Sequence, residues 1–278
     1  MAILLSKFQT RLVAGIKKFQ NVLNIAKAKD INESDTTVIV TDMLSELFGY
    51  DKYLEVTSEY AIKKTYCDLA LKIGGQIRFL LEVKAIGLDL KDDHIKQVID
   101  YGANAGIDWV ILTNGCVWRV YKITYAKPID KELVYEFDIL KLNSKKQNDL
   151  DMLYYVCKES TGKVKSALDD YYLQKQILSR FFIGQVILTE TVIGTIRKYI
   201  KKITPEVKVT NEEIKEILLS EVLKREVLEG NKVEEAKKRI SKSLKASAKK
   251  ETEKVDKEKS DEDKLLEFEE ESKKGKIL

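Results

Sequence analysis

Three charged residues interrupt two apolar runs near the middle of the chain, where buried strands would normally carry none. Asp68 lies in residues 66–73, and Glu82 and Lys84 lie in residues 77–84. Burying an ionised group costs several kcal/mol unless a partner or a metal compensates it. Two carboxylates and an ammonium that converge would form a site for a hard cation that keeps several waters, as Mg²⁺ does. The lysine would then hold or activate a water for attack on a phosphodiester.

Convergence depends on how the two runs pair. Gly74 and Gly75 between them are typical of a β-hairpin turn, and Glu82 and Lys84 are two residues apart, so they share a strand face. With a two-residue turn, paired residue numbers sum to 149 and Asp68 falls on the opposite face. An odd loop or a bulge makes them sum to 150 and sets Asp68 across from Glu82. We predict the odd register.

A helix expected over residues 89–103 follows the hairpin and carries Gln97 and Tyr101 on one face, at positions i and i+4. Near a bound phosphate, the glutamine amide could orient the lysine or the substrate, and the tyrosine hydroxyl could contact the backbone. A partly buried tyrosine beside a helical glutamine would show the same spacing without any function.

A second hairpin is expected from Asn114-Gly115, the strongest short hairpin signal, between apolar residues 107–113 and 116–123. Trp109 and Trp118 in these strands fit a core or a sheet face. Residues 53–62 are expected to form the first strand and residues 133–139 an edge strand. The order of elements predicts an α/β fold with a mixed sheet flanked by helices.

Asp68 together with Glu82-Val83-Lys84 resembles the split active-site signature of the PD-(D/E)xK nuclease superfamily, with Cys67 in place of its proline. Gln97 and Tyr101 resemble the QxxxY motif of the branch that includes type I restriction R subunits. Residues 49–51, 112–115 and 118–121 are similar to the N-terminal nuclease domain of those subunits. The resemblance covers residues 30–125, and the order of elements resembles stand-alone proteins described as predicted type I or type IV restriction endonucleases.

The resemblance implies a restriction-endonuclease-like fold and a Mg²⁺-dependent endonuclease of restriction or defence type that hydrolyses DNA phosphodiester bonds. Asp68, Glu82 and the Val83 carbonyl would hold one or two Mg²⁺ ions, for which Mn²⁺ could substitute, and Lys84 would stabilise a hydroxide or the developing charge. Products with 5′-phosphate and 3′-hydroxyl ends are also implied.

A further acid is expected from the helix that precedes the sheet, because that helix often supplies one in the superfamily. The helix should begin after Asn32 or Ser34 and end before Gly49. Glu33 is the candidate, although an acid in the first turn is also favoured by the helix macrodipole alone. The competing acids of the same helix are Asp42 and Glu46.

Residues 6–29 have apolar positions at helical spacing and carry six basic side chains with no acid. Lys17 and Lys18 are the candidates for contact with a nucleic-acid backbone, which would give sequence-independent, salt-sensitive affinity. An ordinary solvated helix face explains the same pattern.

The chain of 278 residues permits one large or two modest domains. Helical aromatics such as Tyr154, Tyr155, Tyr171 and Tyr172 are interpreted as core rather than base-stacking platforms. Four segments are expected: a basic amphipathic helix (1–29), a PD-(D/E)xK nuclease-like domain (30–145), a helical accessory domain (146–240) and a charged, disordered tail (241–278) with 11 lysines and 11 acids.

Several classes of function are excluded by composition. Three dispersed cysteines without a CxxC pair indicate a reduced, cytoplasmic protein. The single histidine, His94, excludes histidine-rich zinc sites. No apolar stretch is long enough to span a membrane, and no P-loop motif occurs.

The resemblance implies DNA as the partner, and the sequence indicates no membrane and no ATP site in this chain. A motor or specificity subunit would have to be another polypeptide, and homo-oligomers stay open. The alternative function is a non-catalytic DNA-binding or assembly subunit of a restriction or defence complex. The third hypothesis is a regulatory or structural helical protein with a nuclease-like N-terminal half.

Overall fold

The computed structural model describes residues 2–62, 65–125, 128–161 and 166–246. The chain divides into two compact units, unit 1 (Met1–Tyr172) and unit 2 (Leu173–Leu278). This division does not coincide with the expected boundaries at residues 29 and 145, because the first helix and the helices just beyond residue 146 pack into the core of unit 1. The expected tail, residues 241–278, lies outside the described residues from 247 onward.

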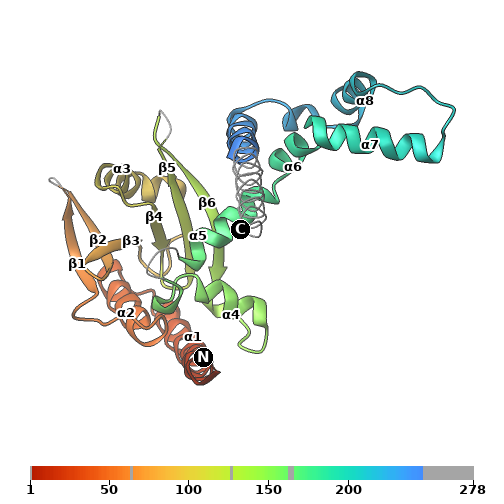
Figure 1. The fold of residues 1–278 in the computed structure, drawn as a ribbon. Helices are drawn as coiled ribbons and strands as arrows, with labels where there is room; N and C mark the ends of the chain where they lie inside the picture. Colours follow the sequence, from red (N-terminus) through yellow and green to blue (C-terminus); the bar gives the residue numbers. More distant parts are fainter. Residues whose placement is uncertain (1, 63–64, 126–127, 162–165, 247–278) are drawn as a thin grey trace, which may run out of the picture. The chain divides into compact units, whose positions relative to one another are not determined.

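The described part of unit 1 contains a six-stranded sheet whose strands lie side by side in chain order (Figure 1). β3 and β4 pair in parallel, and the other neighbours pair antiparallel. The expected mixed sheet is thus confirmed. The strands are β1 (Val56–Ile62), β2 (Thr65–Ile73), β3 (Gln76–Val83), β4 (Trp109–Thr113), β5 (Val117–Thr124) and β6 (Asp130–Asp138).

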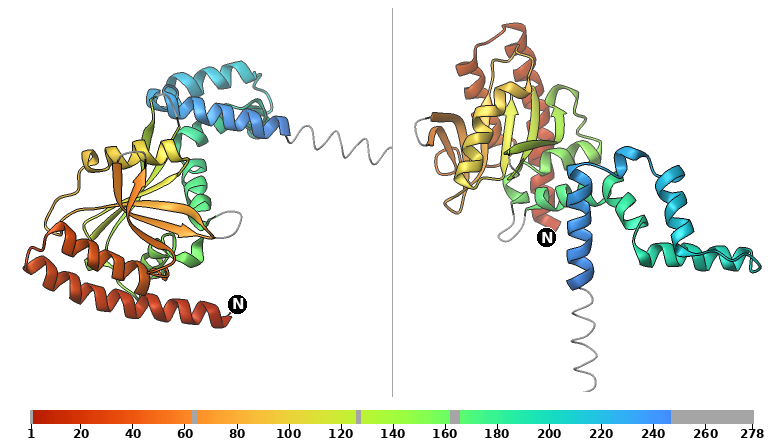
Figure 2. Two further views of the ribbon diagram at one scale, coloured as in Figure 1. Left: turned by 90° about the vertical axis from the view of Figure 1, so that its left-hand side faces the viewer. Right: turned by 90° about the horizontal axis from the view of Figure 1, so that it is seen from above.

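Helices cover both faces of the sheet, because alternate residues of the strands are apolar on each side. α1 (Ala2–Ala28) and α2 (Glu33–Glu46) lie on one face, and α3 (Lys96–Ala105) lies on the other (Figure 2). On the first face, Leu12 and Leu44 share a core with Leu81. On the second, Val98 packs in a cluster with Leu80. α4 (Gln147–Tyr154) joins the first face.

Two elements start later than the sequence indicates, and a local turn explains each. β1 begins at Val56 because the Asp51 carboxylate accepts hydrogen bonds from the Tyr53 and Leu54 amides, both 2.9 Å, and closes a turn. The expected helix over residues 89–103 starts as a 3-10 turn, η1 (Asp92–Ile95), and becomes α-helical at Lys96.

The two expected core tryptophans are buried, and Tyr155, Tyr171 and Tyr172 are partly buried and pack against the core. Trp118 is fully buried and Trp109 is 6% exposed. Tyr155 stacks on Tyr171 with ring centroids 4.6 Å apart, and Tyr135 contacts both rings edge-on. These rings fasten the helices after β6 to the sheet and are used in packing rather than displayed to solvent.

Unit 2 is helical throughout its described residues apart from short turns. The long helices expected over 164–182 and 186–203 are interrupted near Ser179 and Thr189, where Ser179 accepts a hydrogen bond from the Phe182 amide and caps the next helix. Its elements are α6 (Arg180–Ile187), α7 (Glu190–Ile203), α8 (Asn211–Ile217), a π-helical turn (Leu218–Val222), a 3-10 turn (Arg225–Val227) and a helix over residues 231–246; α5 (Ala167–Ile177) crosses the boundary between the units.

Among the described residues, none of the helices has the length and apolar character needed to cross a membrane.

Candidate nuclease-like site

The predicted hairpin of β2 and β3 turns through two residues. Gly74 and Gly75 both have positive φ, 57° and 80°, a conformation that side-chain-bearing residues rarely adopt. Residue numbers paired next to the turn sum to 149. The turn by itself would therefore leave Asp68 on the face opposite Glu82.

A β-bulge at Arg78 shifts this register before the chain reaches Asp68. Beyond the bulge, Leu71 pairs with Phe79, and paired numbers sum to 150. The same register sets Asp68 across from Glu82. The odd register is thus present, produced by a bulge and not by a three-residue loop.

Four charged side chains meet at this place, from β2, from the end of β3 and from the start of α2. The Lys84 ammonium donates to Glu82 Oε1 at 2.7 Å and lies 3.5 Å from both carboxylate oxygens of Glu33. Asp68 Oδ2 accepts a hydrogen bond from the Val83 amide at 2.7 Å. We call Asp68, Glu82, Lys84 and Glu33 the acid–lysine cluster.

The cluster contains three carboxylates and one ammonium, and burial and mutual repulsion make the ionised form of Asp68 and Glu82 unfavourable. Burial, opposed by the Lys84 hydrogen bond and reinforced by Asp68, raises the pKa of Glu82 to about 7. Burial also raises the pKa of Asp68, although the Val83 amide and Lys84 act against it. Burial tends to lower the pKa of Lys84, but the carboxylates of Glu82, Glu33 and Asp68 outweigh it, so that the pKa is raised. An added cation would relieve the surplus charge.

Backbone contacts fix both ends of the cluster. The Lys84 amide donates to the Thr113 carbonyl at 2.8 Å and ties the residue after β3 to the end of β4. Asn32 caps α2, as expected, and accepts from the Asp35 amide at 2.9 Å. The cap places Glu33 in the first helical turn, directed to Lys84.

Two residues of the second hairpin, to which the sequence analysis assigned no site role, hold the segment after Lys84. The buried Asn114 amide donates to the carbonyls of Ile86 and Leu88, at 3.3 and 3.0 Å. Arg119 donates to the Leu90 carbonyl at 2.7 Å. Asn114 therefore holds this segment in addition to its place in the β4–β5 turn. The position of this turn beside the Glu-x-Lys strand could have suggested the role.

Gln97 and Tyr101 lie on α3, on the sheet face to which Glu82 projects, because Leu80, two residues before Glu82, packs in the α3 cluster. The Gln97 amide donates to the Tyr101 hydroxyl. Within the described residues this pair makes no hydrogen bond to the acid–lysine cluster. Their catalytic and nucleic-acid roles stay predictions.

Lys17 and Lys18 lie on a helix that is an integral part of unit 1. Lys18 forms an ion pair with Glu46, at the opposite end of α2 from Glu33. Thirteen residues of helix separate these acids, or about 20 Å at 1.5 Å per residue. The two lysines thus lie away from the acid–lysine cluster, and their contact with nucleic acid stays a prediction.

The three acids considered on α2 have different partners. Asp42 pairs with Lys52 at 2.7 Å, and Glu46 pairs with Lys18. Glu33 alone among them reaches Lys84. The structure therefore brings Glu33, and neither competitor, to the cluster.

The donors present suit a hydrated Mg²⁺ ion better than a fully caged one. In residues 2–62, 65–125, 128–161 and 166–246, no three His, Cys, Asp or Glu side chains converge closely enough to hold a metal ion. Asp68, Glu82 and the Val83 carbonyl supply oxygen donors only, and Mg²⁺ binds through one or two carboxylates while keeping several waters. The negative charge of Asp68 and Glu82, which Lys84 only partly neutralises, is consistent with such an ion.

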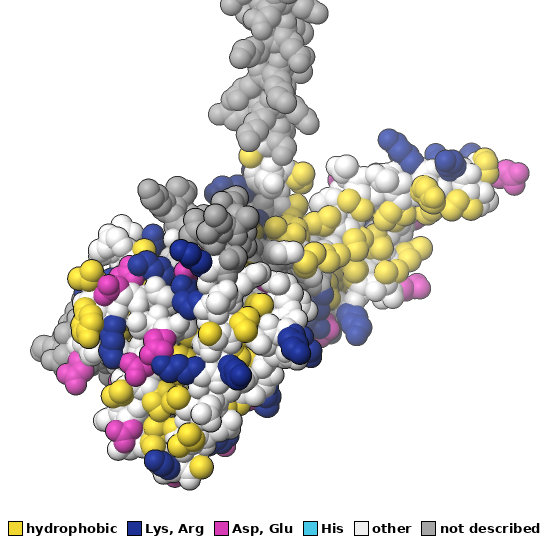
Figure 3. Space-filling view, turned by 90° about the horizontal axis from the view of Figure 1, so that it is seen from below, with side chains coloured by type: hydrophobic (Ala, Val, Ile, Leu, Met, Phe, Trp, Pro, Cys, Tyr) yellow, Lys and Arg dark blue, Asp and Glu magenta, His cyan; other side chains and the backbone are white. Residues whose placement is uncertain are grey.

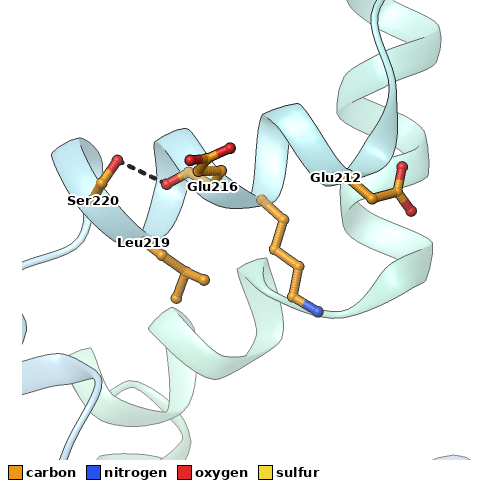
Figure 4. Close-up of a pocket in the computed structure, with 5 residues that line it drawn as sticks. Glu212, Glu216, Leu219 and Ser220 are labelled. Carbon is orange, nitrogen blue, oxygen red and sulfur yellow. Dashed lines mark hydrogen bonds between the residues drawn. The ribbon is translucent and has the colours of Figure 1, made fainter.

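Surface hollows found in unit 2 offer no comparable chemistry. One lies beside α8, lined by Glu212, Lys215, Glu216, Leu219 and Ser220 (Figure 4). The Ser220 hydroxyl donates to the Glu216 carbonyl at 2.8 Å, and Lys215 lies 3.9 Å from Glu190. All five lining residues are exposed, whereas Asp68, Glu82 and Lys84 are half-buried, so the acid–lysine cluster is the candidate site.

The mixed sheet, with an acid on one strand and Glu-x-Lys at the end of the next, is consistent with a nuclease-like domain of the restriction-enzyme type. Residues 38–137 match the model of the family described as type I restriction enzyme R protein N terminus. The match begins in α2, after Glu33, and ends in β6, so it includes Asp68, Glu82 and Lys84. Comparison with curated proteins and with solved structures found no match.

Proposed function

We propose that the protein is a Mg²⁺-dependent endonuclease that hydrolyses DNA phosphodiester bonds in restriction or defence. The observation that carries this proposal is the bulge-shifted register that sets Asp68 opposite Glu82, with Lys84 hydrogen-bonded to Glu82. The restriction-enzyme family of residues 38–137 supports DNA as the substrate. We place this activity in the cytoplasm.

Asp68, Glu82 and the Val83 carbonyl would hold Mg²⁺, with Mn²⁺ able to substitute, and Glu33 would add a ligand through water. The bound ion would supply Lewis-acid polarisation of the phosphoryl group. The Val83 amide orients Asp68 through its 2.7 Å hydrogen bond. The Asn114 amide holds residues 86 and 88 and so fixes the chain that leaves the site.

Lys84 has two tasks in this proposal. Its ammonium lies between Glu82 and Glu33, and its raised pKa keeps it charged at neutral pH. A charged lysine can hold a water for in-line attack and stabilise the negative charge that develops on the phosphate. Gln97 and Tyr101, on the same sheet face, would orient the substrate backbone.

A second candidate function is a non-catalytic DNA-binding or assembly subunit. The lack of a preformed three-ligand group in the described residues favours it. In either case the chain has no P-loop, so an ATP-driven motor would be supplied by a partner subunit.

Cleavage assays separate the two functions. Purified protein is incubated with linear, circular, single-stranded and methylated DNA in Mg²⁺, Mn²⁺ or EDTA. We expect cutting in either metal, none in EDTA, and none with Asp68→Asn or Glu82→Gln. Glu136→Gln, which removes an exposed acid of β6, is the matched control and should cut like the parent. An electrophoretic shift without cutting under any condition would favour the binding subunit.

A further inference from the structure

Positive charge is distributed unevenly between the two units. Residues 1–172 carry 24 basic and 24 acidic side chains, whereas residues 173–246 carry 16 basic and 10 acidic ones. Figure 3 shows acidic and basic side chains intermixed on unit 1, and basic side chains at one end of unit 2 beside a run of hydrophobic ones. The excess of positive charge therefore belongs to the helical unit.

α7 concentrates this charge on one side. Its last seven residues include Arg197, Lys198, Lys201 and Lys202, and its single acid, Glu190, is at the first position. At 100° per residue, these four cations fall within about 140° of the helix circumference. Lys198, Lys201 and Lys202 are exposed and Arg197 is half-buried, next to the fully buried Ile193 that borders this arc, and α7 packs against α6 and α8. α7 thus presents a basic face to solvent.

The four cations of this face have no side-chain partner among the described residues, whereas some other basic residues of unit 2 do. Arg180 pairs with Glu226, and Lys237 pairs with Glu234. Within residues 166–246 and the rest of the described chain, no ion pair or hydrogen bond engages the side chains of Arg197, Lys198, Lys201 or Lys202. Like charges at i and i+4 repel one another, so a polyanion bound here would remove a standing repulsion.

The acid–lysine cluster cannot supply affinity for a polyanion by itself. Apart from Glu33, the segments that flank it, residues 30–35 and 85–93, carry five acidic side chains and one basic one. Phosphates approaching this edge meet net repulsion until a metal is bound. A protein that acts on DNA therefore needs its backbone contacts elsewhere.

We propose that the basic face of α7, formed by Arg197, Lys198, Lys201 and Lys202, binds the phosphate backbone of DNA without regard to sequence. The choice of DNA over another polyanion rests on the proposed function. The face holds substrate for unit 1, and its binding needs neither the metal nor the acid–lysine cluster. Each cation that contacts a phosphate releases a counterion, so the affinity falls steeply with salt.

The test measures binding of the full chain to a labelled 30-base-pair duplex by fluorescence anisotropy, in EDTA so that nothing is cut. Changing all four residues to Gln should weaken binding by at least about tenfold at 0.1 M salt and reduce the slope of log K against log salt by about 3 to 4. Changing Lys198, Lys201 and Lys202 to Arg keeps the charge and should keep the affinity. A matched control removes four exposed lysines of unit 1: Lys7, Lys141, Lys145 and Lys146.

Unchanged affinity and salt slope in the folded four-Gln variant, with circular dichroism confirming the fold, would overturn the inference. So would an equal loss in the unit 1 control, which would mean a general charge effect. Loss of binding to anionic phosphatidylserine vesicles with DNA binding intact would instead assign the face to membranes. Because the assay contains no metal, its result is separate from the cleavage test of the proposed function.

Discussion

Two lysines of the sheet region have nearly the same surroundings, but the acids beside them have pKa values shifted in opposite directions. Lys84 lies 2.7 Å from Glu82 and 3.5 Å from Glu33, and Lys122 lies 2.8 Å from Asp108 and 3.5 Å from Asp169. Both lysine side chains are 16% exposed. Residue types and distances alone would therefore assign both groups the same role.

The difference lies in the hydrogen-bond donors around the acids. Asp169 accepts from Trp109 Nε1 at 3.1 Å and from the Ser166 hydroxyl at 2.6 Å. Burial tends to raise the pKa of Asp169, but these donors and Lys122 outweigh it and lower the pKa. Glu82 is hydrogen-bonded to Lys84, faces Asp68 as well, and its pKa is raised to about 7.

A buried charged group whose hydrogen bonds and ion pairs compensate the cost of burial stabilises the fold. A buried charged group with too few such partners is a candidate for function. The Lys122 group joins β5 to the residues around α5, and the donors to Asp169 compensate the one negative charge that Lys122 leaves. The acid–lysine cluster has a third carboxylate and too few donors, so it stores unfavourable charge that a bound cation would offset. The comparison makes contrasting predictions for matched substitutions.

The largest contrast is expected in catalysis. Lys84→Met should lower the rate of Mg²⁺-dependent DNA cleavage by about 10²- to 10³-fold, because a donor at the developing charge is lost. Lys122→Met removes the same group from the other cluster and should leave the rate within about twofold. Single-turnover cleavage of a plasmid compares the two. Equal losses would show that both lysines act through stability alone.

The next contrast is in stability without metal. Glu82→Gln should raise the free energy of unfolding by roughly 1–3 kcal/mol at pH 8 in EDTA, because an ionised carboxylate of raised pKa no longer has to be buried. Urea unfolding followed by tryptophan fluorescence measures the change. A Glu82→Gln protein less stable than the parent would mean that the Lys84 hydrogen bond outweighs the burial cost.

The smallest contrast is in the acid dependence of stability. The folded pKa of Asp169 lies below its ordinary value, so its contribution is complete above about pH 4 and is lost as the pH falls through the folded pKa. The side chain is 36% exposed, so we expect Asp169→Asn to cost only about 1 kcal/mol at pH 7 and less near pH 3. Unfolding measured from pH 3 to 7 tests this. An equal cost throughout would contradict an ionic role.

Hydrophobic patterning was sufficient to predict the sheet and its helices. The charges that interrupt the apolar runs indicated Asp68, Glu82 and Lys84, and the resemblance to the nuclease superfamily indicated Glu33. The odd register followed from a physical requirement, since Asp68 could otherwise not meet Glu82. The position of the bulge could not be predicted, because Arg78 differs from its neighbours in no pattern that marks a bulge. Contacts across the fold, such as Asn114 to the Leu88 carbonyl, also leave no periodic signal.

The helical half was harder to interpret. Runs that indicated continuous helices break at Ser179, whose side chain caps the next helix, and at Thr189, whose hydroxyl donates to the Val186 carbonyl at 2.7 Å and makes no cap. The basic face of α7 was visible in the sequence as Arg-Lys followed three residues later by Lys-Lys. Its interpretation as a binding face depends on the structure, in which no described residue forms an ion pair or a hydrogen bond with its four side chains.

β3 pairs with β2 across a tight turn and with β4 after a long crossover, and this difference determines the order in which the site assembles during synthesis. Its pairing with β2 spans a tight turn, so Asp68 and Glu82 can meet as soon as the hairpin leaves the ribosome. The Lys84 amide finds its acceptor, the Thr113 carbonyl, only after a parallel crossover of about thirty residues has closed, which is a slower event. A nascent chain that ends before β4 therefore has the carboxylates without a fixed lysine, and assembly of the site is delayed until synthesis has passed that strand.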